Sequence, residues 1–111
     1  MSTDKDYFLV SVDYFKAMVG LSPVEIRIFM HMTDRMDSKN VFSENKTKIR
    51  KAVSASARAV CKAIDKLESL GHIRAVGEDK WMINPRYAIN CDEDLYESLL
   101  EEFNKIPVPE N

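Results

Sequence analysis

The chain has 111 residues, of which 45% are apolar and 31% charged, and its formal net charge at pH 7 is −2. This length suits one domain with one modest core, and the composition is that of a soluble globular protein rather than a disordered or fibrous one. No apolar run approaches the roughly 18–20 residues of a membrane span, and Met1–Asp6 is too polar to open a signal peptide. We therefore expect a cytoplasmic protein with two reduced cysteines, Cys61 and Cys91.

Several classes of enzyme are disfavoured by what the sequence lacks. It contains three glycines, and none falls in a phosphate-binding spacing such as GxGxxG. Its histidines and cysteines show no metal-ligand spacing, and adjacent carboxylates such as Glu101 and Glu102 have no base or nucleophile nearby in the sequence. We therefore expect no cofactor, no metal ion and no enzymatic activity.

The net charge conceals two segments of opposite sign. The segment Lys46–Lys66 has seven basic residues and one acid, a net charge of +6, whereas Asp92–Asn111 has seven acids and one lysine, a net charge of −6. Such asymmetry is informative where the total is not. The basic segment suggests an anionic polymer as a partner, but two ordinary solvated helices would carry the same charges, and charge alone leaves both interpretations open.

The N-terminal half begins with two short elements and one clear helix. The apolar run Tyr7–Val10 is typical of an edge strand or of a lead-in to a short helix that Gly20 ends. Ser22 at the N-cap, Pro23 at the first helical position and Glu25 three residues after the serine then form a capping box, and this helix is predicted to reach about residue 36. Its wide apolar arc indicates burial on more than one side, by a second helix or by another chain.

Two basic helices follow a loop at residues 37–40. The first begins at Ser43 or Asn45 and turns its basic residues mostly outward. After a short turn, Ser56 caps the second, which is predicted to run from about residue 57 to residue 70. Gly71 supplies the left-handed conformation that ends it.

Beyond Gly71 the apolar period changes from that of a helix to that of strands. Ile73–Val76 and Lys80–Ile83 are typical of two short strands around a tight turn, and Asn84–Pro85 ends the second because proline cannot continue a ladder. A final acidic helix is predicted from about Asp92 to Asn104.

This order of elements predicts a mainly α protein with a small β-hairpin, in the α+β class, and more finely a winged helix-turn-helix. Residues 1–20 would form an N-terminal segment with a short helix, residues 21–88 the winged helix-turn-helix domain, and residues 89–111 an acidic C-terminal helix and tail. We expect all three parts to belong to a single domain.

The segment Leu67–Ile73 resembles the junction between recognition helix and wing in bacterial winged-helix regulators, where a leucine, three variable residues, a glycine, one further residue and an aliphatic residue follow one another. With Trp81–Pro85, which reads Trp-Met-Ile-Asn-Pro, the chain is similar over about residues 21–87 to the RepL family of plasmid replication and maintenance proteins. The resemblance implies a winged-helix fold and a role in replication or copy control. Helix-turn-helix segments usually carry a small residue where Arg50 stands and a glycine where Ser54 stands.

If the helix capped by Ser56 enters a major groove, its first turns meet the base edges. Arg58 is the candidate for direct readout because its guanidinium can bond guanine O6 and N7 together, and Ala59 would offer a methyl contact to thymine. Lys62 and Lys66 lie further along the helix and are expected to meet phosphates, while Ser56 would also donate to a phosphate. The preceding helix is expected to grip the DNA backbone through Lys46, Lys48 and Lys51.

Two hypotheses from different classes remain. The first is a sequence-specific protein of a plasmid, phage or other mobile element that binds double-stranded DNA and acts in replication, copy control or partition, or as a transcriptional regulator. A protomer with only a few positive groups would bind DNA weakly at physiological salt. We therefore expect a homodimer, with a seam formed by the helix at residues 22–36 and the acidic C-terminal helix.

The alternative hypothesis is an adaptor whose acidic C-terminal helix binds a basic protein partner, such as a replisome or RNA polymerase component. Neither involves a membrane.

Overall fold

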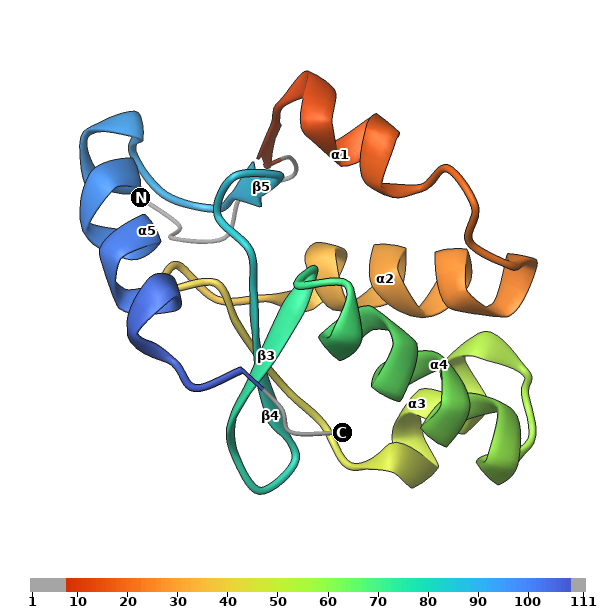
Figure 1. Ribbon diagram of the computed structural model, residues 1–111. Helices are drawn as coiled ribbons and strands as arrows, with labels where there is room; N and C mark the ends of the chain where they lie inside the picture. The colour runs from red at the N-terminus through yellow and green to blue at the C-terminus, as the bar shows by residue number, and fades with distance from the viewer. Residues whose placement is uncertain (1–7, 109–111) are drawn as a thin grey trace, which may run out of the picture.

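Within residues 8–108, which the computed structural model describes, the chain is mainly helical and carries two small antiparallel sheets (Figure 1). The predicted α+β class is therefore confirmed. The residues at 1–7 and 109–111, which include Tyr7 of the predicted first strand and the start Met1–Asp6, lie outside the described part. Within that part, no helix has the length and apolar character that crossing a membrane would need.

Three helices build the main core. They are α2 (Pro23–Arg35), α3 (Lys46–Val53) and α4 (Ala57–Ser69), and α2 contacts both of the others. The predicted capping box is confirmed: Ser22 Oγ accepts from the backbone N–H of Glu25 at 3.3 Å, and Glu25 Oε1 accepts from the backbone N–H of Ser22 at 2.8 Å. Buried apolar side chains from the three helices interlock in this core, among them Ile28, Phe29, Met32, Ile49, Val53, Val60, Ile64 and Leu67.

The wide apolar arc of α2 is covered within the chain itself. Of its large apolar side chains only Met30 is exposed, at 51%. The arc is therefore buried largely within the core of one protomer. Exposed apolar side chains lie instead on α1 (Val12–Ala17) and just beyond it, where Val12, Phe15 and Val19 are 69%, 64% and 82% exposed.

The central sheet has three antiparallel strands where the sequence predicts two. They are β2 (Val41–Ser43), β3 (Ile73–Gly77) and β4 (Lys80–Ile83), in the order β2–β4–β3. The hairpin β3–β4 is confirmed, and β2 lies between the predicted loop at 37–40 and the predicted helix. Phe42 of β2 stands opposite Trp81 of β4, with 6.3 Å between ring centroids, and both side chains are buried.

A buried asparagine fixes the start of β2. Asn40 adopts a positive φ of 63°, and its side-chain nitrogen donates to the backbone oxygens of Ile83 at 3.0 Å and Ala88 at 2.8 Å. The carboxylate of Asp37 accepts from the backbone N–H of Val41 at 3.0 Å. The turn is thus held by contacts with residues more than forty positions away, which periodicity does not reveal.

The N-terminal segment is fastened to the chain beyond β4. Strand β1 (Leu9–Val10) pairs antiparallel with β5 (Ala88–Ile89) and forms the second sheet. The hydroxyl of Ser11 donates to the backbone oxygen of Arg86 at 2.6 Å. Segments that are about eighty residues apart therefore lie side by side, above α2 in Figure 1.

The C-terminal element differs in detail from the single helix predicted for Asp92–Asn104. Its first turn is a 3-10 helix, η1 (Glu93–Leu95), and the α-helix α5 (Tyr96–Lys105) follows. Asp92 provides no side-chain cap, and its backbone oxygen accepts from the N–H of Leu95 at 3.0 Å, the three-residue spacing of the tighter helix. Buried side chains join α5 to the sheets in a second, smaller core formed by Met82, Ile89, Cys91, Leu99 and Phe103.

Candidate nucleic-acid interface

The helix pair α3–α4 is joined by a tight, well-capped turn. Asn45 Oδ1 accepts from the backbone N–H of Lys48 at 2.9 Å, and Ser56 Oγ accepts from that of Ala59 at 3.1 Å, so each helix has a side-chain N-cap. Ser54 ends α3 in the left-handed region, with φ 54° and ψ 52°. This conformation costs roughly 1–2 kcal/mol for a residue with a Cβ.

Helix α4 buries one face and exposes the other. Val60, Ile64 and Leu67 are at most 1% exposed, and their packing turns the opposite face outward. Arg58 and Lys62 are both exposed on that face, one helical turn apart. The first two turns of α4 therefore expose Arg58 and Lys62, two of the residues predicted to contact DNA. Ala59 is only half-buried at the edge of this face.

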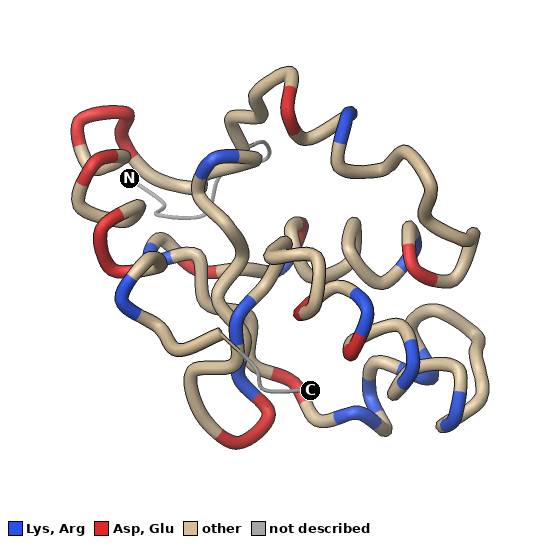
Figure 2. Tube along the Cα trace, viewed as in Figure 1, with Lys and Arg blue, Asp and Glu red and all other residues tan. Residues whose placement is uncertain are grey.

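Helix α3 adds further exposed cations beside those of α4. Figure 2 shows the basic positions of the two helices gathered on one part of the molecule, away from the acidic positions of η1 and α5. Apart from Lys66 of α4, none of these basic residues takes part in an ion pair recorded within residues 8–108. We use the name basic surface for the six exposed residues Lys46, Lys48, Arg50, Lys51, Arg58 and Lys62.

Lys66, predicted to meet phosphates, is held elsewhere. Its Nζ lies 3.4 Å from Glu25 Oε1 and 3.4 Å from the backbone oxygen of Gly20. Burial alone would raise the pKa of Glu25, but hydrogen bonds from Ser22 and Lys66, with the charge of Lys66, outweigh it and hold the pKa of Glu25 below its usual value. Lys66 is thus drawn towards the start of α2, and the structure does not group it with the basic surface.

Acidic residues mark two borders of the basic surface. Asp65 is exposed one turn beyond Lys62, and burial together with the charge of Asp65 raises the pKa of the nearby Glu68 carboxyl. At the turn between β3 and β4, Glu78 and Asp79 are also exposed. A polyanion lying on α3 and α4 would therefore meet repulsion at the far half of α4 and at this turn.

The sequence-based site omits Arg50, which the structure places in the basic surface. Because helix-turn-helix segments usually carry a small residue at this position, the resemblance gives Arg50 no role. Arg50 is, however, one of the seven basic residues of the segment Lys46–Lys66, and this cluster of charge is the sequence feature that points to it. In the structure Arg50 lies in the last turn of α3, exposed and next to Ser54.

The histidines and cysteines lie apart from the basic residues of α3 or hold structural contacts, except that Cys61 is exposed on α4. A ring nitrogen of His31 lies 3.0 Å from Glu44 Oε1, and one of His72 lies 3.0 Å from the backbone oxygen of Ala17. Cys61 is exposed, and Cys91 is buried in the smaller core. Within residues 8–108, no group of three or more His, Cys, Asp or Glu side chains is arranged to hold a metal ion.

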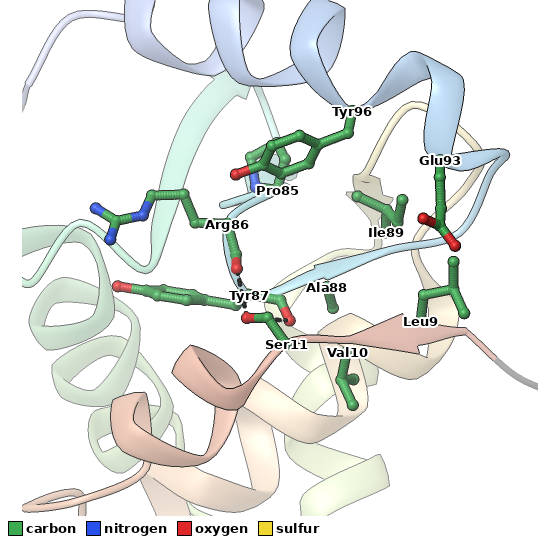
Figure 3. A pocket seen from close by; sticks show the side chains of 10 residues that line it. All are labelled: Leu9, Val10, Ser11, Pro85, Arg86, Tyr87, Ala88, Ile89, Glu93 and Tyr96. Carbon is green, nitrogen blue, oxygen red and sulfur yellow. Dashed lines mark hydrogen bonds between the residues drawn. The ribbon is translucent and has the colours of Figure 1, made fainter.

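A groove of about 390 Å³ lies between the β1–β5 sheet and the start of α5 (Figure 3). Its walls are mostly apolar, from residues such as Pro85, Ile89 and Tyr96. Arg86 at its rim pairs with Asp13, 3.6 Å away.

No family model, curated protein or solved structure matches this chain.

Proposed function

We propose that the protein is a winged helix-turn-helix that binds double-stranded DNA in a sequence-specific manner. The fold supports this proposal in that two helices joined by a short turn, α3 and α4, are followed by the hairpin β3–β4. The observation that carries the proposal is the basic surface: six exposed cations on two adjoining helices, none of them in an ion pair recorded for residues 8–108. Phosphate neutralisation by such side chains supplies most of the affinity of a protein for a duplex.

In this proposal α4 enters the major groove with its first two turns. Arg58 reads a guanine through O6 and N7, and the methyl group of Ala59 meets a thymine at the edge of the contact. Lys62 and the three lysines of α3 bind phosphates and set the register. Ser56 accepts a hydrogen bond through Oγ as a cap, so its hydroxyl proton is free to be donated to a phosphate.

We further propose that two copies bind a symmetric site. A single protomer offers few phosphate contacts, and a dimer on two half-sites doubles both the contacts and the sequence that is read. The RepL resemblance favours replication or copy control of a mobile element, while transcriptional regulation would use the same docking surface. The proposed activity is binding, without catalysis.

The proposal is tested by selecting bound fragments from random-sequence and genomic duplexes. The expected result is an enriched site with two inverted half-sites about 10 base pairs apart from centre to centre. Sedimentation of the protein with and without that duplex then reports how many copies bind. The proposal is overturned if no sequence is enriched over the starting pool.

The second candidate is the adaptor function, and one observation favours it. The acidic side chains of η1 and α5 are exposed and gathered away from the basic surface (Figure 2), namely Glu93, Asp94, Glu97, Glu101 and Glu102. A basic partner would dock there without touching α4. Replacing Glu97, Glu101 and Glu102 by glutamine would abolish function in that case, while Arg58→Ala and Lys48→Ala would change nothing.

A further inference from the structure

A hollow of about 330 Å³ lies beside the turn between α3 and α4. It is lined by the last turn of α3 and by the turn itself, through Thr47, Arg50, Lys51, Ser54 and Ala55. Five residues that are close in sequence thus surround one concave place at the margin of the basic surface. No residue in its lining is acidic.

The surface of the hollow is mostly apolar, but cationic and hydroxyl-bearing residues stand among those that line it. Arg50 and Lys51 are exposed, and neither takes part in an ion pair recorded for residues 8–108. Thr47 and Ser54 add two hydroxyl groups, which donate hydrogen bonds to oxyanions. A guanidinium, an ammonium and hydroxyls are the groups that proteins use to bind phosphate oxygens.

The backbone of Ser54 gives an independent reason to assign a role to this place. With φ 54° it occupies the left-handed region, where glycine would cost nothing and serine is strained. Strained residues that are not glycine concentrate at functional sites, because the side chain is retained for what it does. Ser54 is one of the residues that line the hollow, so a function of its side chain would be exercised there.

We propose that this hollow is a phosphate-binding site that holds one backbone phosphate of the bound DNA, with Arg50 and Lys51 supplying charge and Thr47 and Ser54 supplying hydrogen bonds. The inference rests on the proposed function and adds to it. It assigns a DNA contact to Thr47, Arg50 and Ser54, which the sequence-based site lacks, and gives Lys51 a defined place. The bound phosphate fixes the turn against the backbone and so sets the angle at which α4 enters the groove.

Ser54 gives the sharpest test, because relief of its backbone strain should raise stability whereas loss of its hydroxyl should weaken binding to the duplex. Ser54→Gly relieves the left-handed strain and is expected to raise Tm by about 3–6 °C. The same change is expected to weaken duplex binding several-fold. Ser54→Ala keeps the strain and removes only the hydroxyl, and it is expected to weaken binding to a similar extent without raising Tm.

Charge variants complete the test. Arg50→Gln and Lys51→Gln are each expected to reduce the salt slope of binding by about 0.9 per protomer. Lys16→Gln on α1 is the matched control and is expected to leave the slope unchanged. Wild-type affinity and slope in Ser54→Ala, Arg50→Gln and Lys51→Gln together would overturn the site while the proposed function stands.

Pyrophosphate separates the two proposals. The expected result is that backbone amide NMR signals shift at residues 47, 50 and 54 when pyrophosphate is added to the wild-type protein, and that Arg50→Gln removes these shifts. If the protein binds no duplex but shows them, the proposed function falls and the phosphate site remains, for a phosphorylated ligand other than DNA. If it shows neither duplex binding nor shifts, both are overturned.

Discussion

The ammonium nitrogen of Lys66 lies 3.4 Å from Oε1 of Glu25, the residue that closes the capping box of α2. This contact divides the cations of α4 into two groups. Arg58 and Lys62, in the first half, point to solvent, while Lys66 is tied to the scaffold. In our proposal, therefore, the first half of α4 carries most of the contact with DNA.

Lys62 and Lys66 should differ in their contribution to binding. Lys62→Gln removes an unpaired cation, so we expect weaker binding to every duplex and a salt slope reduced by about 0.9 per protomer. Lys66→Gln should change the slope by less than half as much, and should lower stability by at most about 1 kcal/mol because the Lys66 side chain keeps 43% of its surface exposed to solvent. Fluorescence anisotropy over a salt series measures both. Equal slope changes in the two variants would show that Lys66 leaves Glu25 to bind DNA.

Arg58→Ala should alter sequence preference rather than general affinity. Loss of a bidentate contact to guanine is worth about 1–3 kcal/mol of discrimination at one base pair. We therefore expect the variant to tolerate substitutions at one position of each half-site and to keep its preference elsewhere. Competition with single-substituted duplexes measures this. Lys48→Ala is the matched control and should weaken all duplexes alike.

Arg74 fastens α5 to the central sheet. Its Nη1 donates to the backbone oxygens of Ile106 at 2.9 Å and Phe103 at 3.4 Å, and its guanidinium carbon lies 4.8 Å from the centroid of the Phe103 ring. Arg74→Met keeps the aliphatic contacts and removes the charge, and we expect it to lower the free energy of unfolding by about 1–3 kcal/mol.

Urea unfolding measures that loss, and hydrogen exchange locates it. Exchange should accelerate first in the amides of α5. Arg27→Met is the control, since Arg27 is exposed and takes part in no ion pair recorded for residues 8–108. Unchanged exchange in α5 of the Arg74 variant would contradict the role assigned to this contact.

His72 should make stability fall in mild acid. Burial lowers its pKa below the ordinary value of 6.5, although a hydrogen bond with the backbone oxygen of Ala17 acts in the opposite direction. The unfolded chain thus binds a proton more readily, so stability is complete above about pH 6.5 and declines as the pH falls towards the pKa of the folded state. Urea unfolding between pH 5 and pH 7.5 should show this slope, and His72→Gln should flatten it. A wild-type slope in the variant would assign the effect to another group.

Local signals predicted the helices well. The capping box at Ser22 and the cap at Ser56 depend on residues three positions apart, and Gly71 ends α4 with φ 78°, so sequence alone placed these elements to within a residue or two. The hairpin β3–β4 was predicted equally well, because the alternation of its strands and its tight turn both depend on neighbouring residues. The exposure of Arg58 and Lys62 follows directly from the apolar stripe on the other side of α4.

Contacts between residues that are far apart in the sequence could not be predicted from such local signals. Strand β2 pairs with β4 after a turn at which Asn40 reaches Ile83 and Ala88, and β1 pairs with β5; neither relation leaves a local pattern. The pairing of Lys66 with Glu25 depends on how α2 and α4 cross. A single exposed charge therefore could not be assigned to DNA or to the scaffold from the sequence.

The most direct test of the central claim is the affinity for the selected duplex as a function of salt concentration, from about 50 to about 300 mM, beside a scrambled duplex. If at least three cations of the basic surface bind phosphates, the logarithm of affinity falls with the logarithm of salt concentration with a slope of about −2.7 or steeper per protomer, and the selected duplex binds more tightly at every salt concentration. An affinity that does not depend on salt, or equal affinities for the two duplexes throughout, would contradict it.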